Sequence, residues 1–121
     1  MRRSGSASVL LLATALVAGC GTSIGGVNLR PELYYQQQIT LRGRITRMQT
    51  VGGVTLLELA DAREHRILVR IDGQPTQAIG DWVKATGVLV PETRVGDQVV
   101  YDVLQAEDLD GASPPWLDRL T

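Results

Sequence analysis

The sequence predicts a small all-β domain that closes into a five-stranded Greek-key barrel. From Gln38 onward, apolar and polar residues alternate with a period of two, which is typical of strands with one buried and one solvated face. Five such segments are separated by short polar stretches, and none has the apolar stripe of a helix. An open five-stranded sheet would expose two edges, so a closed barrel is the simplest arrangement.

Three strands are predicted in the first half of this domain. The first starts at Gln38 and is closed by a turn at Gly52-Gly53. The second covers residues 54–61, and the third covers residues 65–72, with positions 67, 69 and 71 on one face. The polar connection between the second and third strands is short enough for a hairpin.

The second half is predicted to hold two more strands. Residues 73–80 form a polar connection without the stripe of a helix, a fourth strand covers 81–90, and a loop covers 91–98. The fifth strand covers 99–106. Asp102 shares the parity of the inward Leu104 and Ala106, so we expect either a bulge there or a place for Asp102 at the barrel rim.

Four segments carry a resemblance to the OB-fold, a small Greek-key barrel: residues 39–45, 56–61, 80–89 and 104–109. The resemblance extends over residues 38–110. It looks closest to exported bacterial OB-fold proteins and more faintly to starvation-inducible outer-membrane lipoproteins. Gly43 and Gly87 fall where such barrels coil their long strands, because a missing Cβ permits the bend. These relatives imply a fold and a location, and no catalytic residue.

Cys20 is the only cysteine, and it follows an apolar run. The run from Ala7 to Ala18 has 12 residues, whereas a membrane-spanning helix needs about 20. Two arginines precede the run, and Leu16-Val17-Ala18-Gly19 stands directly before Cys20. This arrangement resembles the signal peptide of a bacterial lipoprotein. It implies cleavage before Cys20 and acylation of that cysteine with palmitate-type chains.

The lipoprotein resemblance also implies a location and a division of the chain. The protein would be held in the cell envelope by its lipid, and Gly21 in place of Asp implies the outer membrane, facing the periplasm, if the bacterium has two membranes. The predicted parts are a signal peptide (1–19), a lipidated cysteine with a tether (20–37), the barrel (38–110) and a tail (111–121). Residues 21–33 hold three glycines and a proline without periodicity, which predicts a flexible tether.

Aromatic residues flank the predicted barrel on both sides. Tyr34 and Tyr35 are expected to cap one barrel end or to lie at the lipid headgroups. In the tail, Trp116 and Leu117 follow two prolines and are expected to dock on a barrel end, with a partner protein as the alternative.

Charge and aromatic content argue against nucleic-acid binding. Without residues 1–19, ten basic side chains remain against thirteen acidic ones, a formal balance of −3. The chain has no Phe, and the predicted strands 54–61 and 65–72 contain no aromatic residue. Each base stacked on an aromatic ring contributes roughly 1–3 kcal/mol, and a cationic groove supplies most of the rest. We therefore expect no nucleic-acid partner.

Four arginines are predicted on the outer face of the first and third strands: Arg42, Arg44, Arg66 and Arg70. Guanidinium groups bind carboxylates and phosphates bidentately. One hypothesis is therefore a docking face for another envelope protein or for an anionic envelope glycan or lipid, formed with the loops 49–53 and 91–98. The other is cross-strand pairing with Glu58, which would leave the arginines a structural and solubilising role.

No catalytic, metal or cofactor site is predicted. His65 is the only histidine, and no Ser or Cys stands at a spacing that defines a relay with it, so we expect a surface turn residue. The C-terminal acidic residues, Asp97, Asp102, Glu107, Asp108 and Asp110, lack the alternating spacing of a Ca²⁺ loop. A non-enzymatic binding module is therefore expected. The alternative is a non-catalytic structural or stress-adaptation role in the outer membrane.

Overall fold

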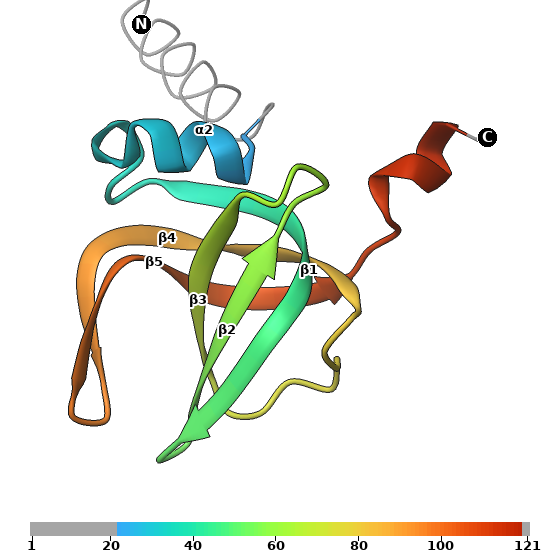
Figure 1. The fold of residues 1–121 in the computed structure, drawn as a ribbon. Coiled ribbons are helices and arrows are strands. Elements are labelled where there is room, and N and C mark those ends of the chain that lie inside the picture. The colour runs from blue at the N-terminus through green and yellow to red at the C-terminus, as the bar shows by residue number, and fades with distance from the viewer. Residues whose placement is uncertain (1–21, 120–121) are drawn as a thin grey trace, which may run out of the picture.

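The computed structural model describes residues 22–119, so the predicted signal peptide and Cys20 lie outside the described residues. Five strands dominate it, which confirms the all-β class (Figure 1). The elements in chain order are the helix α2 (Ile24–Leu29), the 3₁₀-helix η1 (Pro31–Leu33), the strands β1 (Gln38–Val51), β2 (Val54–Ala60), β3 (Arg66–Asp72), β4 (Trp82–Val95) and β5 (Gln98–Gly111), and the 3₁₀-helix η2 (Pro115–Arg119).

The strands form a closed barrel in the order β1-β2-β3-β5-β4, so the predicted Greek-key barrel of the OB-fold is confirmed. Strand β1 pairs with two strands: its first half pairs with β4 and its second half pairs with β2. Arg44 marks the crossover, with Ala60 opposite it on one side and Trp82 on the other. The barrel closes where β3 and β5 pair in parallel, from Leu68 with Val103 to Arg70 with Gln105.

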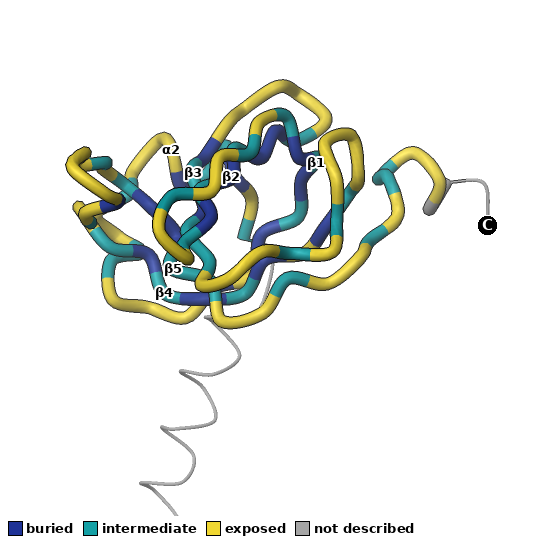
Figure 2. The backbone as a smooth tube through the Cα atoms, turned by 90° about the horizontal axis from the view of Figure 1, so that it is seen from below, coloured by how far each residue is buried: buried dark blue, intermediate teal, exposed yellow. Residues whose placement is uncertain are grey.

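The inward positions predicted from the alternation form the core. Figure 2 shows the buried positions running along the strands that enclose the barrel interior. Ile71, predicted inward, is only partly buried against this core. The buried cluster consists of Ile24, Val27, Ile39, Leu41, Ile45, Leu57, Leu59, Ile67, Val69, Val83, Ala85, Leu89 and Leu104.

Gly87 lies where the backbone of β5 passes close to β4. A Cβ at this position would stand 2.0 Å from the carbonyl oxygen of Gln105, which no side chain tolerates. The register between β4 and β5 also shifts between Thr86 and Gly87. The glycine expected from the sequence to permit a bend is therefore required because another backbone occupies the space of a Cβ.

The prediction of a loop at 91–98 is wrong. These residues extend β4 and β5 into a long hairpin that ends in a turn at Gly96-Asp97. Pro91 and Asp102 lie opposite each other where the pairing is interrupted, between Val90 with Val103 and Glu92 with Tyr101. Proline has no N–H to donate, and Asp102 takes a left-handed φ of 54°. The irregularity expected at Asp102 is therefore a local backbone distortion opposite a proline.

The expectation of a flexible tether at 21–33 is also wrong over the residues described. Ser23 caps α2 by accepting a hydrogen bond from the Gly26 N–H at 3.0 Å. Ile24 and Val27, one helical turn apart, are each 1% exposed and belong to the barrel core. Two glycines inside the helix hide this short i, i+3 pair from a periodicity analysis.

The flanking aromatic residues differ in their placement. Tyr34 and Tyr35 pack against the core, as the capping hypothesis expects, and Tyr35 donates a hydrogen bond to Asp102 that raises the pKa of the tyrosine. Trp116 does not dock on the barrel, because it is 58% exposed. The two-proline segment before it leads the tail away from the strands (Figure 1).

Replacing Ile24 by Ala tests whether α2 belongs to the folded domain. Removing a fully buried Ile side chain should lower the free energy of unfolding by about 2–4 kcal/mol, measured by urea denaturation. Leu29→Ala in the same helix is the control, because Leu29 is 82% exposed and its truncation should change stability by less than about 0.5 kcal/mol. Equal, small effects of both substitutions would show that α2 is not part of the folded domain and would support the predicted tether.

Candidate binding face

The outer face of β1, β2 and β3 holds the four predicted arginines, although not as one cluster. Arg44 and Arg66 both lie opposite Ala60 and so flank β2 at the same level. Arg70 is four residues further along β3, opposite Leu56. Arg42 is opposite Lys84 of β4, on the other side of β1. Only Arg44 and Arg66 are therefore brought together across β2.

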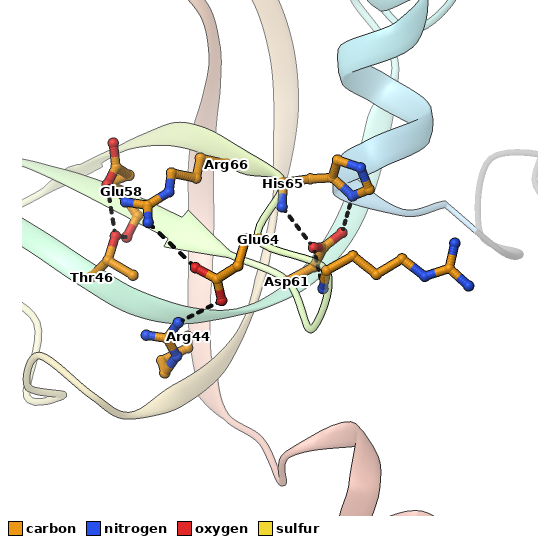
Figure 3. Close-up of polar contacts among 8 residues, drawn as sticks. Arg44, Thr46, Glu58, Asp61, Glu64, His65 and Arg66 are labelled. Carbon is orange, nitrogen blue, oxygen red and sulfur yellow. Dashed lines mark hydrogen bonds and ion pairs between the residues drawn. The ribbon is translucent and has the colours of Figure 1, made fainter.

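Arg44 and Arg66 belong to a polar network with Thr46, Glu58 and Glu64 (Figure 3). Arg66 donates to Glu58 at 2.9 Å and to Glu64 at 3.3 Å. Arg44 donates to the other oxygen of Glu64 at 3.0 Å. Two guanidinium groups thus face two carboxylates, so the charges of Arg44 and Arg66 are compensated. Pairing with Glu58 was expected, whereas the part played by Glu64 was not.

Glu58 is the most enclosed charge of this network, with a side chain 16% exposed. Partial burial acts to raise its pKa, but hydrogen bonds from Thr46 at 2.8 Å and from Arg66 outweigh burial. The pKa of Glu58 therefore lies below its ordinary value of 4.5. The carboxylate is held ionised and fixed against the sheet, which gives the face a rigid polar centre.

A groove lies beside this network, between the two long hairpins. Its lining residues come from β1, β2, β3 and β5, and its volume is about 470 Å³. The tips of the hairpins meet at its end, since a Cβ on Gly96 would stand 3.0 Å from the Val51 side chain. The residues that line this hairpin groove are Arg47, Met48, Gln49, Leu56, Leu57, Glu58, Leu68 and Gln98.

The hairpin groove combines an apolar floor with polar sides. Leu56 and Leu68 point outward from β2 and β3 but are only half-buried. Arg47 and Glu58 lie opposite each other across β1 and β2. Nearby, Arg70 pairs with Asp72 at 3.6 Å, and its Nε is buried without a hydrogen-bond partner in the part of the chain described. The surface therefore offers apolar contact together with charges of both signs.

Sequence reasoning found part of this groove. Gln49 and Gln98 fall in the segments 49–53 and 91–98 of the predicted docking face, and Glu58 is the predicted arginine partner. Leu56 and Leu68 were missed, although a signal existed, because both are leucines at outward positions of an alternating strand. That they line one groove with Gln98 of β5 depends on tertiary structure.

His65 lies in the turn before β3, as expected. Asp61 organises this turn by accepting the backbone N–H groups of Arg63 and His65, both at 2.9 Å, and its other oxygen lies 3.0 Å from Nδ1 of His65. Partial burial acts to raise the pKa of Asp61, but these hydrogen bonds lower it overall. The imidazole also packs over α2, because a Cβ on Gly25 would lie 2.7 Å from Nδ1.

The acidic residues of the C-terminal half do not gather into a site. Among the side chains that the structure describes, those of residues 22–117, there is no group of three His, Cys, Asp or Glu placed to hold a metal ion. Over the same residues, no helix has the length and apolar character needed to cross a bilayer.

Comparisons with known proteins support the fold. A putative aspartyl-tRNA synthetase from Leishmania major Friedlin is similar in structure, with a TM-score of 0.57 and 11% sequence identity over 88% of this chain. This chain spans 26% of the length of that synthetase chain. At such low identity the likeness shows the fold alone. The sequence matches no protein-family model and no curated protein. The topology and this likeness together identify the chain as an OB-fold barrel.

Replacing Glu58 by Gln tests the polar network. The loss of charged hydrogen bonds to Thr46 and Arg66 should lower the free energy of unfolding by about 1–2 kcal/mol at pH 7. Because the folded-state pKa is depressed, this contribution is present above pH 4.5 and is lost as the pH falls below it. Urea denaturation of both proteins should therefore show the difference shrinking as the pH falls from 4.5.

The control for this substitution is Glu64→Gln. Glu64 has a side chain 57% exposed, so its loss should lower stability by less than about 1 kcal/mol. A Glu58→Gln protein as stable as the unmodified protein at pH 7 would contradict the assigned role.

Proposed function

We propose that the protein is a lipid-anchored module of the bacterial cell envelope that binds an extended segment of another envelope protein in its hairpin groove. The observation that carries this proposal is the groove itself, enclosed by two hairpins whose tips touch. Its outward leucines and its charges of both signs suit a polypeptide, which offers apolar side chains and hydrogen-bonding groups together.

The charge distribution favours a protein over an anionic glycan or lipid as the ligand. In the polar network, Glu58 and Glu64 already occupy the guanidinium groups of Arg44 and Arg66. A phosphate or carboxylate ligand would have to displace these side chains, whereas a peptide can use the groove without breaking them. The network then acts as a rigid polar border of the binding site.

Lipid anchoring is supported by the signal pattern that ends at Cys20. Cys20→Ala should abolish incorporation of a labelled fatty acid and should move the protein from the membrane fraction to the soluble fraction. Metabolic labelling followed by cell fractionation measures both effects. Full labelling of the Cys20→Ala protein would show that the acyl chain sits elsewhere, and absence of label from the unmodified protein would show that it is not a lipoprotein.

Site-specific photo-cross-linking tests the groove. A benzophenone amino acid at Gln49 or Gln98, incorporated in living cells, should join the protein to a partner identifiable by mass spectrometry. The same probe at Gln74, an exposed residue of the connection between β3 and β4, is the matched control and should give at least tenfold less product.

A substitution that introduces a charge on the groove floor gives a second test of the binding site. Leu68→Lys should reduce cross-linking from Gln49 at least tenfold while the protein stays folded, because Leu68 is only half-buried. Thr76→Lys on an exposed loop should leave cross-linking unchanged. Equal cross-linking from Gln49 and Gln74 would reject the groove as a binding site.

A further inference from the structure

The end of the barrel that carries α2 lies next to the predicted lipid anchor. We infer that this end rests directly against the bilayer surface, with Leu29 and Trp116 at the level of the lipid headgroups, and that the hairpin groove opens away from the membrane. This inference rests on the lipid anchoring in the proposed function, and it adds an orientation that the anchor alone does not supply.

The length of chain between Cys20 and α2 carries the first step. Four residue steps join Cys20 to Ile24, and a fully extended chain spans at most about 14 Å over that length. Ile24 is 1% exposed and fixed in the barrel core. Any acyl chain on Cys20 therefore holds the first turn of α2 close to the headgroup layer, which is roughly 5–8 Å thick on each side of a bilayer.

The surface at this end has the side chains that suit a membrane interface. Leu29 is 82% exposed, although it lies on a helix whose other face is buried, and Leu33 of η1 is 54% exposed. Trp116 is 58% exposed on the tail. Leucine and tryptophan are energetically favoured at the boundary between headgroups and acyl chains, where the indole N–H still has a polar partner.

Leu29 and the tail belong to one surface. A depression of about 500 Å³ is lined by Leu29 and Gly25 of α2, by Arg63 and His65 of the turn between β2 and β3, and by Pro115 directly before Trp116. Figure 1 shows α2, this turn and η2 on the same side of the barrel. The exposed apolar residues next to both ends of the described chain thus share one face.

The charge at this face also suits a membrane. Arg30 is paired with Glu32 at 3.3 Å, and Asp61 is occupied by the turn that it caps. Arg63 lines the depression, is exposed and makes no ion pair with the side chains that the structure describes, those of residues 22–117. An unpaired guanidinium beside apolar residues is attracted to anionic headgroups. We therefore take an anionic lipid surface as the partner of this face.

The hairpin groove is then directed toward the aqueous side. Figure 1 shows the turn between β1 and β2 and the tip of the β4–β5 hairpin at the opposite end of the barrel from α2. The groove ends where these tips meet. A barrel held by α2 against the bilayer would present the groove to proteins in the aqueous compartment.

Quenching by spin-labelled lipids tests this orientation. The acylated full-length protein is reconstituted in vesicles of phosphatidylethanolamine and phosphatidylglycerol that contain a headgroup-proximal doxyl lipid. Trp82→Phe leaves Trp116 as the only tryptophan, and Trp82→Phe/Trp116→Phe/Leu29→Trp places a single probe on α2. Both proteins should show at least threefold stronger quenching than the control Trp82→Phe/Trp116→Phe/Gln74→Trp, whose probe lies on the opposite end.

Each outcome of this experiment supports or overturns the proposed orientation. Equal quenching of the three probes, with acylation of Cys20 verified by mass spectrometry, overturns the orientation and leaves lipid anchoring intact. An unmodified Cys20 overturns both. Quenching needs no partner protein, so a failure of groove cross-linking does not affect this result, and the two proposals fail separately.

Discussion

The parallel pairing of β3 with β5 is the constraint on which the rest of the architecture depends. It spans only Leu68 to Arg70 on β3, and it joins segments far apart in the chain, so its closure carries a large entropic cost. The inward Val69 and Leu104 at this junction are fully buried and offset that cost. Because the junction is short, β5 separates from β3 before Val103 and continues with β4 as a free hairpin. The hairpin groove exists because of this separation.

The N-terminal segment connects the core to that hairpin. Ile24 and Val27 of α2 fill the barrel end, and Asn28 donates a hydrogen bond to the carbonyl of Arg66 at the start of β3. Further along, Gln36 donates to the carbonyl of Leu89, and Tyr35 bonds to Asp102 where the hairpin leaves the barrel. One continuous segment therefore covers the core, protects a strand end and braces the hairpin. Its attachment to a membrane would fix the orientation of the whole barrel.

The outer face illustrates how charge pairing changes a functional interpretation. From the sequence, the four arginines of the outer face suit either a docking face or pairing with Glu58. In the structure, the turn before β3 brings Glu64 between Arg44 and Arg66, and Asp72 pairs with Arg70. Three acidic side chains thus pair with three of the arginines, so the distinctive feature of the face is the groove with Leu56 and Leu68 on its floor. Arginines that are already paired, beside apolar floor residues, favour recognition of a polypeptide over recognition of a polyanion.

By itself, the sequence determined the barrel, because an alternation with period two fixes which side chains enter the core, and five such segments leave few ways to close a sheet. It also fixed the inward positions of β1, β3 and β4, since a slip of one residue would expose every one of them. Tertiary structure decided the rest. The helix α2 forms because the barrel end accepts Ile24 and Val27. A sequence of six residues with two glycines does not predict this burial. The segment 91–98 becomes a hairpin because Val95 and Gln98 can pair beyond Pro91. The groove and the pairing of the arginines arise from contacts between strands and turns, which no local pattern encodes.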